Sequence, residues 1–111
     1  MALAACLYHD SLALYRDLGS TIDRVWCLEG LAALAAVQEQ PEQAGRLWAA
    51  AQQARTILGM PLSPGDRRRF EQYVAPARAR LGSFRWATIM DDALPLELAI
   101  TYTLEHHTTT D

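Results

Sequence analysis

A spacing pattern that occurs twice, 40 positions apart, restricts most strongly how this chain can fold. The pattern consists of a small residue, an aromatic residue four positions later, a second small residue and a closing Leu-Gly pair. Its two copies are Ala4, Tyr8, Ser11, Leu18 and Gly19, and then Ala44, Trp48, Ala51, Leu58 and Gly59. Small residues let neighbouring helices come close, and the aromatic ring fills the space beside them. The pattern therefore predicts helices that pack against units of the same kind.

Helix caps and helix breakers divide the chain into segments. Leu-Gly pairs close three apolar runs, at 18–19, 58–59 and 81–82, where a left-handed glycine commonly ends a helix. β-branched residues are few, and no segment alternates apolar and polar residues as a strand does. The sequence predicts an all-α chain with helices at 2–18, 21–38, 41–58, 64–81, 83–91 and 95–106. Pro76 lies inside the fourth of these, where we expect a kink or a break because proline removes an amide donor.

The central part of the chain resembles a tetratricopeptide repeat, which is a helix-turn-helix unit. The residues that match its small and large positions are Leu31, Ala32, Ala35, Ala44, Trp48 and Ala51. A common repeat of this kind has about 34 residues, so the longer offset here implies longer helices. The resemblance implies an all-α fold, namely an antiparallel helix-hairpin, tetratricopeptide-like α-solenoid fragment of about five to six helices.

Longer stretches resemble the carboxy-terminal helical arms of bacterial LuxR-type transcriptional regulators and related signalling ATPases. They are SLALYRDLG, WCLEGLAALAAVQEQPEQAGRLWAAA, LGMPLSPGDRRRFEQ and LPLELAITYTL. The resemblance implies a cytoplasmic, non-enzymatic interaction or self-association arm that belongs to a larger bacterial regulator. The expected partners are upstream repeats of the same polypeptide, another protein, or a second copy of the chain in a homodimer.

The same resemblance predicts one helical domain over residues 1–106. Its expected parts are a half repeat at 1–19, a full repeat at 20–59, a divergent repeat at 60–92 and a capping helix at 94–106. Residues 107–111 are expected to form a disordered tail. The first helix matches the second helix of a repeat, so its partner helix is expected upstream of Met1.

A candidate partner-binding groove follows from the repeat register, because the first helix of each repeat lines the concave face of such an arm. In this chain the register places there Trp26, Glu29, Ala33, Ala36 and Val37. This lining is apolar and shallow, which favours an apolar helix or segment as the occupant. The alternative is that the same stripe is buried by the chain itself as ordinary core.

A candidate basic contact patch is formed by Arg67, Arg68 and Arg69. Such a run could attract an acidic partner or nucleic acid. The alternative is a solvated helix face in which Arg67 pairs with Glu71 at i,i+4. Because the net charge is -3 and no recognition-helix pattern occurs, we expect no direct contact with nucleic acid.

Composition and motifs argue against an enzyme. All ten basic residues are arginine, which removes Schiff-base and P-loop lysines. Neither GxSxG nor HExxH occurs, and the adjacent Asp91 and Asp92 point about 100° apart on a helix. We expect no catalytic residue, no cofactor and no metal site. Cys6 and Cys27 are expected to be buried reduced thiols, and no apolar run approaches the ~20 residues of a membrane span.

A second functional hypothesis is that the chain is a helical effector sensor. In that case a small molecule would lie between helices near Trp26, Trp48 or Trp86 and would order the arm.

Overall fold

The computed structural model describes residues 10, 14 and 21–105 of the chain. Residues 21–105 form five helices: α2 (Thr21–Val37), α3 (Pro41–Leu58), α4 (Pro64–Leu81), α5 (Ser83–Asp91) and α6 (Leu96–Glu105). No strand occurs among the described residues. The predicted all-α class is therefore confirmed.

Each of these helices agrees with its predicted range to within about one residue at either end. Asp10 and Leu14 are helical as well. The rest of the predicted helix at 2–18, most of the half repeat at 1–19 and the tail at 107–111 lie outside the described residues. The same is true of Cys6 and of the first copy of the repeat pattern.

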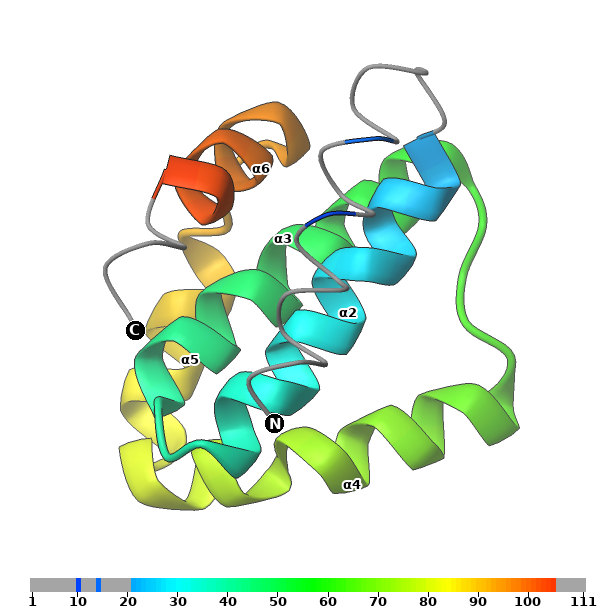
Figure 1. Cartoon of the computed structure of the whole chain (residues 1–111). Coiled ribbons are helices and arrows are strands. Elements are labelled where there is room, and N and C mark those ends of the chain that lie inside the picture. The colour runs from blue at the N-terminus through cyan, green and yellow to red at the C-terminus, as the bar shows by residue number, and fades with distance from the viewer. Residues whose placement is uncertain (1–9, 11–13, 15–20, 106–111) are drawn as a thin grey trace.

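The helices α2 and α3 run antiparallel and form the central pair of the fold (Figure 1). α4 packs across both of them, α5 packs against α3 and α4, and α6 packs mainly against α3. The turn between α2 and α3 passes through Glu39, whose φ of 60° lies in the left-handed region. This conformation reverses the chain within three residues and brings the second helix back along the first.

Local capping explains where the helices begin and end. The hydroxyl of Ser63 accepts a hydrogen bond of 3.2 Å from the backbone N–H of Asp66, and Pro64 occupies the first turn of α4. Gly59 adopts φ 67° and ψ 30° after α3, and its N–H donates to the carbonyl of Thr56. Both signals were readable in the sequence, which is why the helix bounds were predictable.

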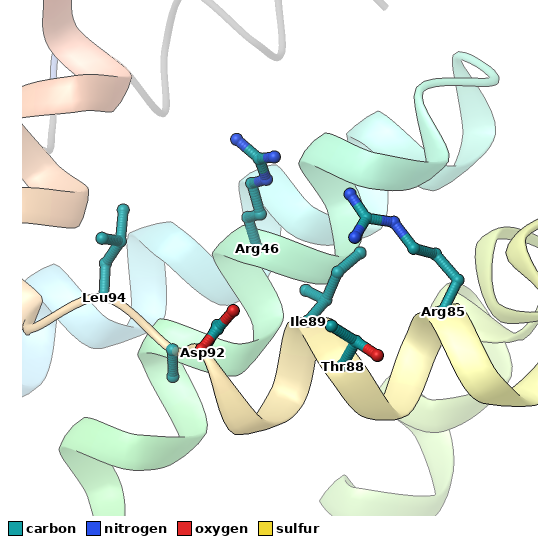
Figure 2. A pocket seen from close by; sticks show the side chains of 7 residues that line it. Arg46, Arg85, Thr88, Ile89, Asp92 and Leu94 are labelled. Carbon is teal, nitrogen blue, oxygen red and sulfur yellow. The ribbon is translucent and has the colours of Figure 1, made fainter.

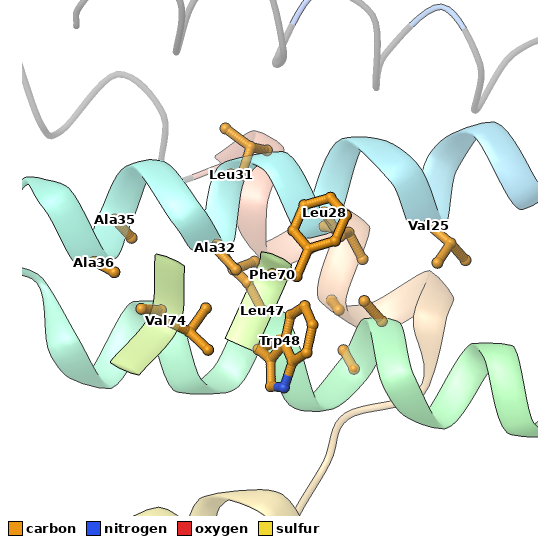
Figure 3. Packing of buried hydrophobic residues seen from close by; sticks show 14 of the residues in the cluster. Val25, Leu28, Leu31, Ala32, Ala35, Ala36, Leu47, Trp48, Phe70 and Val74 are labelled. Atoms are coloured by element: carbon orange, nitrogen blue, oxygen red, sulfur yellow. The ribbon is translucent and has the colours of Figure 1, made fainter. Parts of the chain in front are cut away.

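The core lies where the alanine-rich faces of α2 and α3 meet (Figure 3). Ala32, Ala35, Ala44 and Ala51 are each almost fully buried, and the Trp48 side chain is 6% exposed beside them. The ring of Phe70 reaches this layer from α4, with its centroid 6.0 Å from that of Trp48. Trp48 therefore fills the space that the small residues leave between the helices.

The break expected at Pro76 does not occur, because α4 continues from Pro64 to Leu81 with this proline inside it. Pro76 lies on the exposed side of the helix, whereas Val74 and Ala77 are buried. The carbonyl of Gln72, which loses its usual donor to proline, lies one turn earlier on that exposed side and can be hydrated. Packing of the buried face then holds the helix together.

Candidate functional site

Two stripes of side chains, one on α2 and one on α4, border a shallow groove of about 440 Å³. We call it the α2/α4 groove. Its main lining residues are Ala33, Leu34 and Val37 from α2 and Arg69, Phe70 and Tyr73 from α4. On each helix two adjacent positions are followed by a third that lies three or four residues later, so the three share one face. The groove is thus formed by two facing helical stripes.

Aromatic rings border this groove and support one another. The Phe70 ring meets Trp26 edge-on at 6.3 Å and Tyr73 edge-on at 6.2 Å. Phe70 is 7% exposed, whereas Trp26 and Tyr73 are each 48% exposed. The buried ring therefore contacts both half-exposed rings, and together the three present apolar surface along the groove.

The structure distributes the predicted groove residues between the surface and the core. Ala33 and Val37 line the α2/α4 groove, and Trp26 lies beside it through its contact with Phe70. Ala36 is 6% exposed and belongs to the core. Glu29 is fully buried, and its carboxylate accepts hydrogen bonds from Arg55, so it does not face the groove.

The basic patch is divided in a similar way. Arg67 lies 3.8 Å from Glu71, which confirms the predicted i,i+4 pair. Arg69 forms an ion pair of 2.9 Å with Asp66 and lies over the Phe70 ring, 5.6 Å from its centroid. Arg68 is exposed, and no described carboxylate forms an ion pair with it. Arg69 therefore joins the groove and the patch, which the sequence analysis treated separately.

A second hollow, of about 320 Å³, lies between α3, α5 and the turn that follows α5 (Figure 2). We call it the α3/α5 cavity. Arg46, Arg85 and Ile89 extend to the same side in this view, and Asp92 lies at the end of α5. Sequence reasoning missed this site, because its residues come from segments more than thirty positions apart with no motif to connect them.

The charges at this cavity are connected through Glu42. Arg85 donates hydrogen bonds from Nε and Nη2 to Oε1 of Glu42, at 3.0 and 2.6 Å. These hydrogen bonds, and the charges of Arg85 and then Arg46, hold the pKa of the Glu42 carboxyl below its ordinary value. Arg46 itself lies 3.7 Å from Glu42, which is too far for a good hydrogen bond.

Gly45 sets the close approach of α3 and α5 at this cavity. A Cβ atom placed on Gly45 would lie 3.3 Å from the side chains of both Ile89 and Trp86. The missing side chain therefore lets α5 settle onto α3, with Ile89 only 5% exposed between them.

Two further features of the described residues bear on chemistry. No group of three or more His, Cys, Asp or Glu side chains within them could hold a metal ion. Cys27 is buried and free, and burial, followed by the negative charge of Asp23, raises the pKa of its thiol.

None of the described helices is long and apolar enough to pass through a bilayer.

Comparison of the chain with protein-family models, with curated proteins and with solved structures gave no match.

Proposed function

We propose that this chain is a non-enzymatic, tetratricopeptide-like interaction arm that binds an amphipathic helix of a protein partner in the α2/α4 groove. The observation that carries the proposal is the set of half-exposed apolar side chains along this groove, namely Trp26, Val37 and Tyr73. We further propose that the arm serves a larger cytoplasmic bacterial regulator of the LuxR type, or a related signalling ATPase.

The chemistry of the lining supports a protein occupant. Tryptophan and tyrosine are enriched at the centres of protein interfaces, because they bury much area at a small cost in side-chain entropy. Trp26 and Tyr73 both contact Phe70. A partner that covers them would therefore gain apolar burial.

The charge at the edge of the groove narrows the choice of occupant. Arg69 lines the groove, and Arg68 next to it in sequence is exposed with no ion pair to a described residue. An apolar helix flanked by acidic residues would therefore be attracted, and one flanked by basic residues would be repelled. Such a helix would place apolar residues at i, i+4 and i+7 into the groove.

The arrangement of the helices supports the repeat-like part of the proposal. α2 and α3 form an antiparallel hairpin, and α4 then packs on both members of that hairpin. In a stacked array of hairpins, the first helix of the next unit occupies the same place.

The proposal is tested with two synthetic helical peptides and the full chain. Both peptides carry Leu, Phe and Leu at i, i+4 and i+7, with flanking Glu in one and flanking Lys in the other. Calorimetry is expected to show tighter binding of the Glu peptide. Tyr73→Ala should weaken that binding about tenfold or more, because it removes a central aromatic contact. Phe84→Ala should leave it unchanged, since Phe84 is 88% exposed on α5 and does not line the groove.

One outcome would refute the helix-binding groove, and another would assign it to a different occupant. Failure of both peptides to bind, or equal binding by the Tyr73→Ala variant, would refute the proposed helix-binding groove. A homodimer that persists on dilution in light scattering, and that Tyr73→Ala separates, would instead assign the groove to a second copy of this chain.

A further inference from the structure

We propose that the α3/α5 cavity binds a small α-amino acid with an apolar side chain, whose carboxylate is held by Arg46 and whose ammonium group is held by Asp92. This site is separate from the α2/α4 groove and does not depend on it.

The cavity lies where α5 packs closely on α3. Arg85, Thr88 and Ile89 follow one another at helical spacing and share the face of α5 that meets α3, and Asp92 follows directly after α5 as its C-cap. Ile89 forms the apolar base of the cavity, because it packs against α3 at Gly45. The volume of about 320 Å³ lies at the small end of the range in which proteins bind small molecules.

The positive charge that remains for a ligand is that of Arg46. Two hydrogen bonds from Arg85 already hold Glu42, whereas Arg46 only approaches the same carboxylate at 3.7 Å. The Arg46 side chain is 48% exposed and lines the cavity. A guanidinium group in this state can offer two parallel N–H donors to a ligand carboxylate.

The negative charge that remains is that of Asp92. Its backbone N–H donates to the carbonyl of Thr88, which ends α5. Its carboxylate lines the cavity and forms no ion pair with any described residue. A ligand that carries only an anion would satisfy Arg46 but would face Asp92 as a like charge. A zwitterion matches both groups at once.

A smaller, mostly apolar hollow lies beside the charged part of the cavity. This hollow of about 80 Å³ shares Arg46 and Leu94 with the cavity and is also lined by Leu47, Ala99 and the Tyr102 ring. The apolar side chain of the amino acid would lie here, between α3 and α6. The ligand would thereby connect α3, α5 and α6, and its binding is expected to favour the packed arrangement of these helices.

The first experiment compares four ligands by calorimetry on the full chain. L-leucine carries both charges and the side chain, isocaproate lacks the ammonium group, isoamylamine lacks the carboxylate, and glycine lacks the side chain. We expect L-leucine to bind most tightly, and each of the others to bind about tenfold or more weakly, because each loses one charged or apolar contact.

The second experiment assigns the two charges with variants. Arg46→Gln should lose the preference for leucine over isoamylamine, and Asp92→Asn should lose the preference for leucine over isocaproate. Arg68→Gln and Asp91→Asn are the matched controls, because both residues are exposed and neither lines the cavity. The controls should bind leucine as the unchanged chain does. Far-ultraviolet circular dichroism checks that all four variants are folded.

The proposal is overturned if L-leucine gives no binding heat at millimolar concentration, or if isocaproate binds as tightly as leucine. It is also overturned if Arg46→Gln and Asp92→Asn, both folded, bind leucine as well as their controls do. Each result concerns the α3/α5 cavity alone and leaves the test of the α2/α4 groove unaffected.

Discussion

Glu29 of α2 and Arg55 of α3 form an ion pair that is closed off from solvent. Nε and Nη2 of Arg55 donate hydrogen bonds of 2.7 and 2.8 Å to the two carboxylate oxygens of Glu29. The Arg55 side chain is 7% exposed and the Glu29 side chain 0%. Gln52 donates a further hydrogen bond to Glu29, and Nη1 of Arg55 donates to the carbonyl of Met60. The pair therefore connects α2, α3 and the segment after α3 inside the protein.

Removing one member of this pair is expected to destabilise the fold strongly. Arg55→Met leaves the Glu29 carboxylate buried without its main partner, so the free energy of unfolding should fall by about 3–5 kcal/mol. Urea denaturation measures the change. The double variant Glu29→Met with Arg55→Met should recover much of the loss, because it leaves no unpaired buried charge. A loss in the single variant below about 1 kcal/mol would contradict the burial of the pair.

Trp48 and Trp26 should differ clearly in their contribution to stability. Trp48→Ala empties a site in the middle of the core and should cost about 3–5 kcal/mol in chemical denaturation. Trp26→Ala removes a half-exposed ring and should cost only about 1–2 kcal/mol. Equal losses for the two variants would mean that the rings do not occupy core and surface as described.

Gly45 and Gly65 provide a matched test of helix packing. Gly45→Leu introduces a side chain where even a Cβ would lie 3.3 Å from Ile89 and Trp86, so it should lower the free energy of unfolding by about 1–3 kcal/mol. A Cβ on Gly65 meets no atom within 4 Å, so Gly65→Leu should leave stability unchanged or raise it by up to about 1 kcal/mol. Denaturant titration of both variants checks the contrast. A neutral Gly45→Leu would mean that α5 does not pack closely on α3.

The pKa of Glu42 should respond to the loss of Arg85. Arg85→Gln removes the hydrogen bonds and the charge that lower this pKa, so the pKa of Glu42 should rise toward that of an ordinary glutamate. Because the pKa of Glu42 is lowered in the folded chain, the Glu42–Arg85 pair stabilises the fold at pH values above the ordinary pKa of a glutamate. This stabilisation is lost as the pH falls through the lowered pKa of the folded chain. Carboxyl titration by nuclear magnetic resonance measures the shift. Arg80→Gln is the control, since Arg80 pairs with Glu39 and not with Glu42. If the pKa of Glu42 does not rise in Arg85→Gln, then Arg85 is not what lowers it.

The helices themselves could be predicted closely because their signals are local. Ser63 caps α4 through Asp66, and Gly59 adopts the left-handed conformation that ends α3. Each signal acts within one turn of the chain, so the sequence around it is sufficient. Pro76 was a local signal for a kink or a break, and the break does not occur, since its exposed position lets α4 continue.

The candidate sites could be predicted only in part. The repeat register placed Ala33 and Val37 on one stripe, and both line the α2/α4 groove. The same register could not indicate that Glu29 faces inward, because its partner Arg55 is 26 positions away on another helix. The α3/α5 cavity likewise depends on the crossing of α3 and α5 at Gly45.

Sequence alone determined the helical class, the ends of the helices and the small and large residues of the α2–α3 core. These properties depend on contacts within one turn or on periodicity along one helix. Tertiary structure alone decided which charges are buried, that Arg69 joins the groove of α2, and that Arg46 and Asp92 line one cavity. Those relationships depend on how rigid helices cross, which is set by side-chain packing between segments distant in sequence.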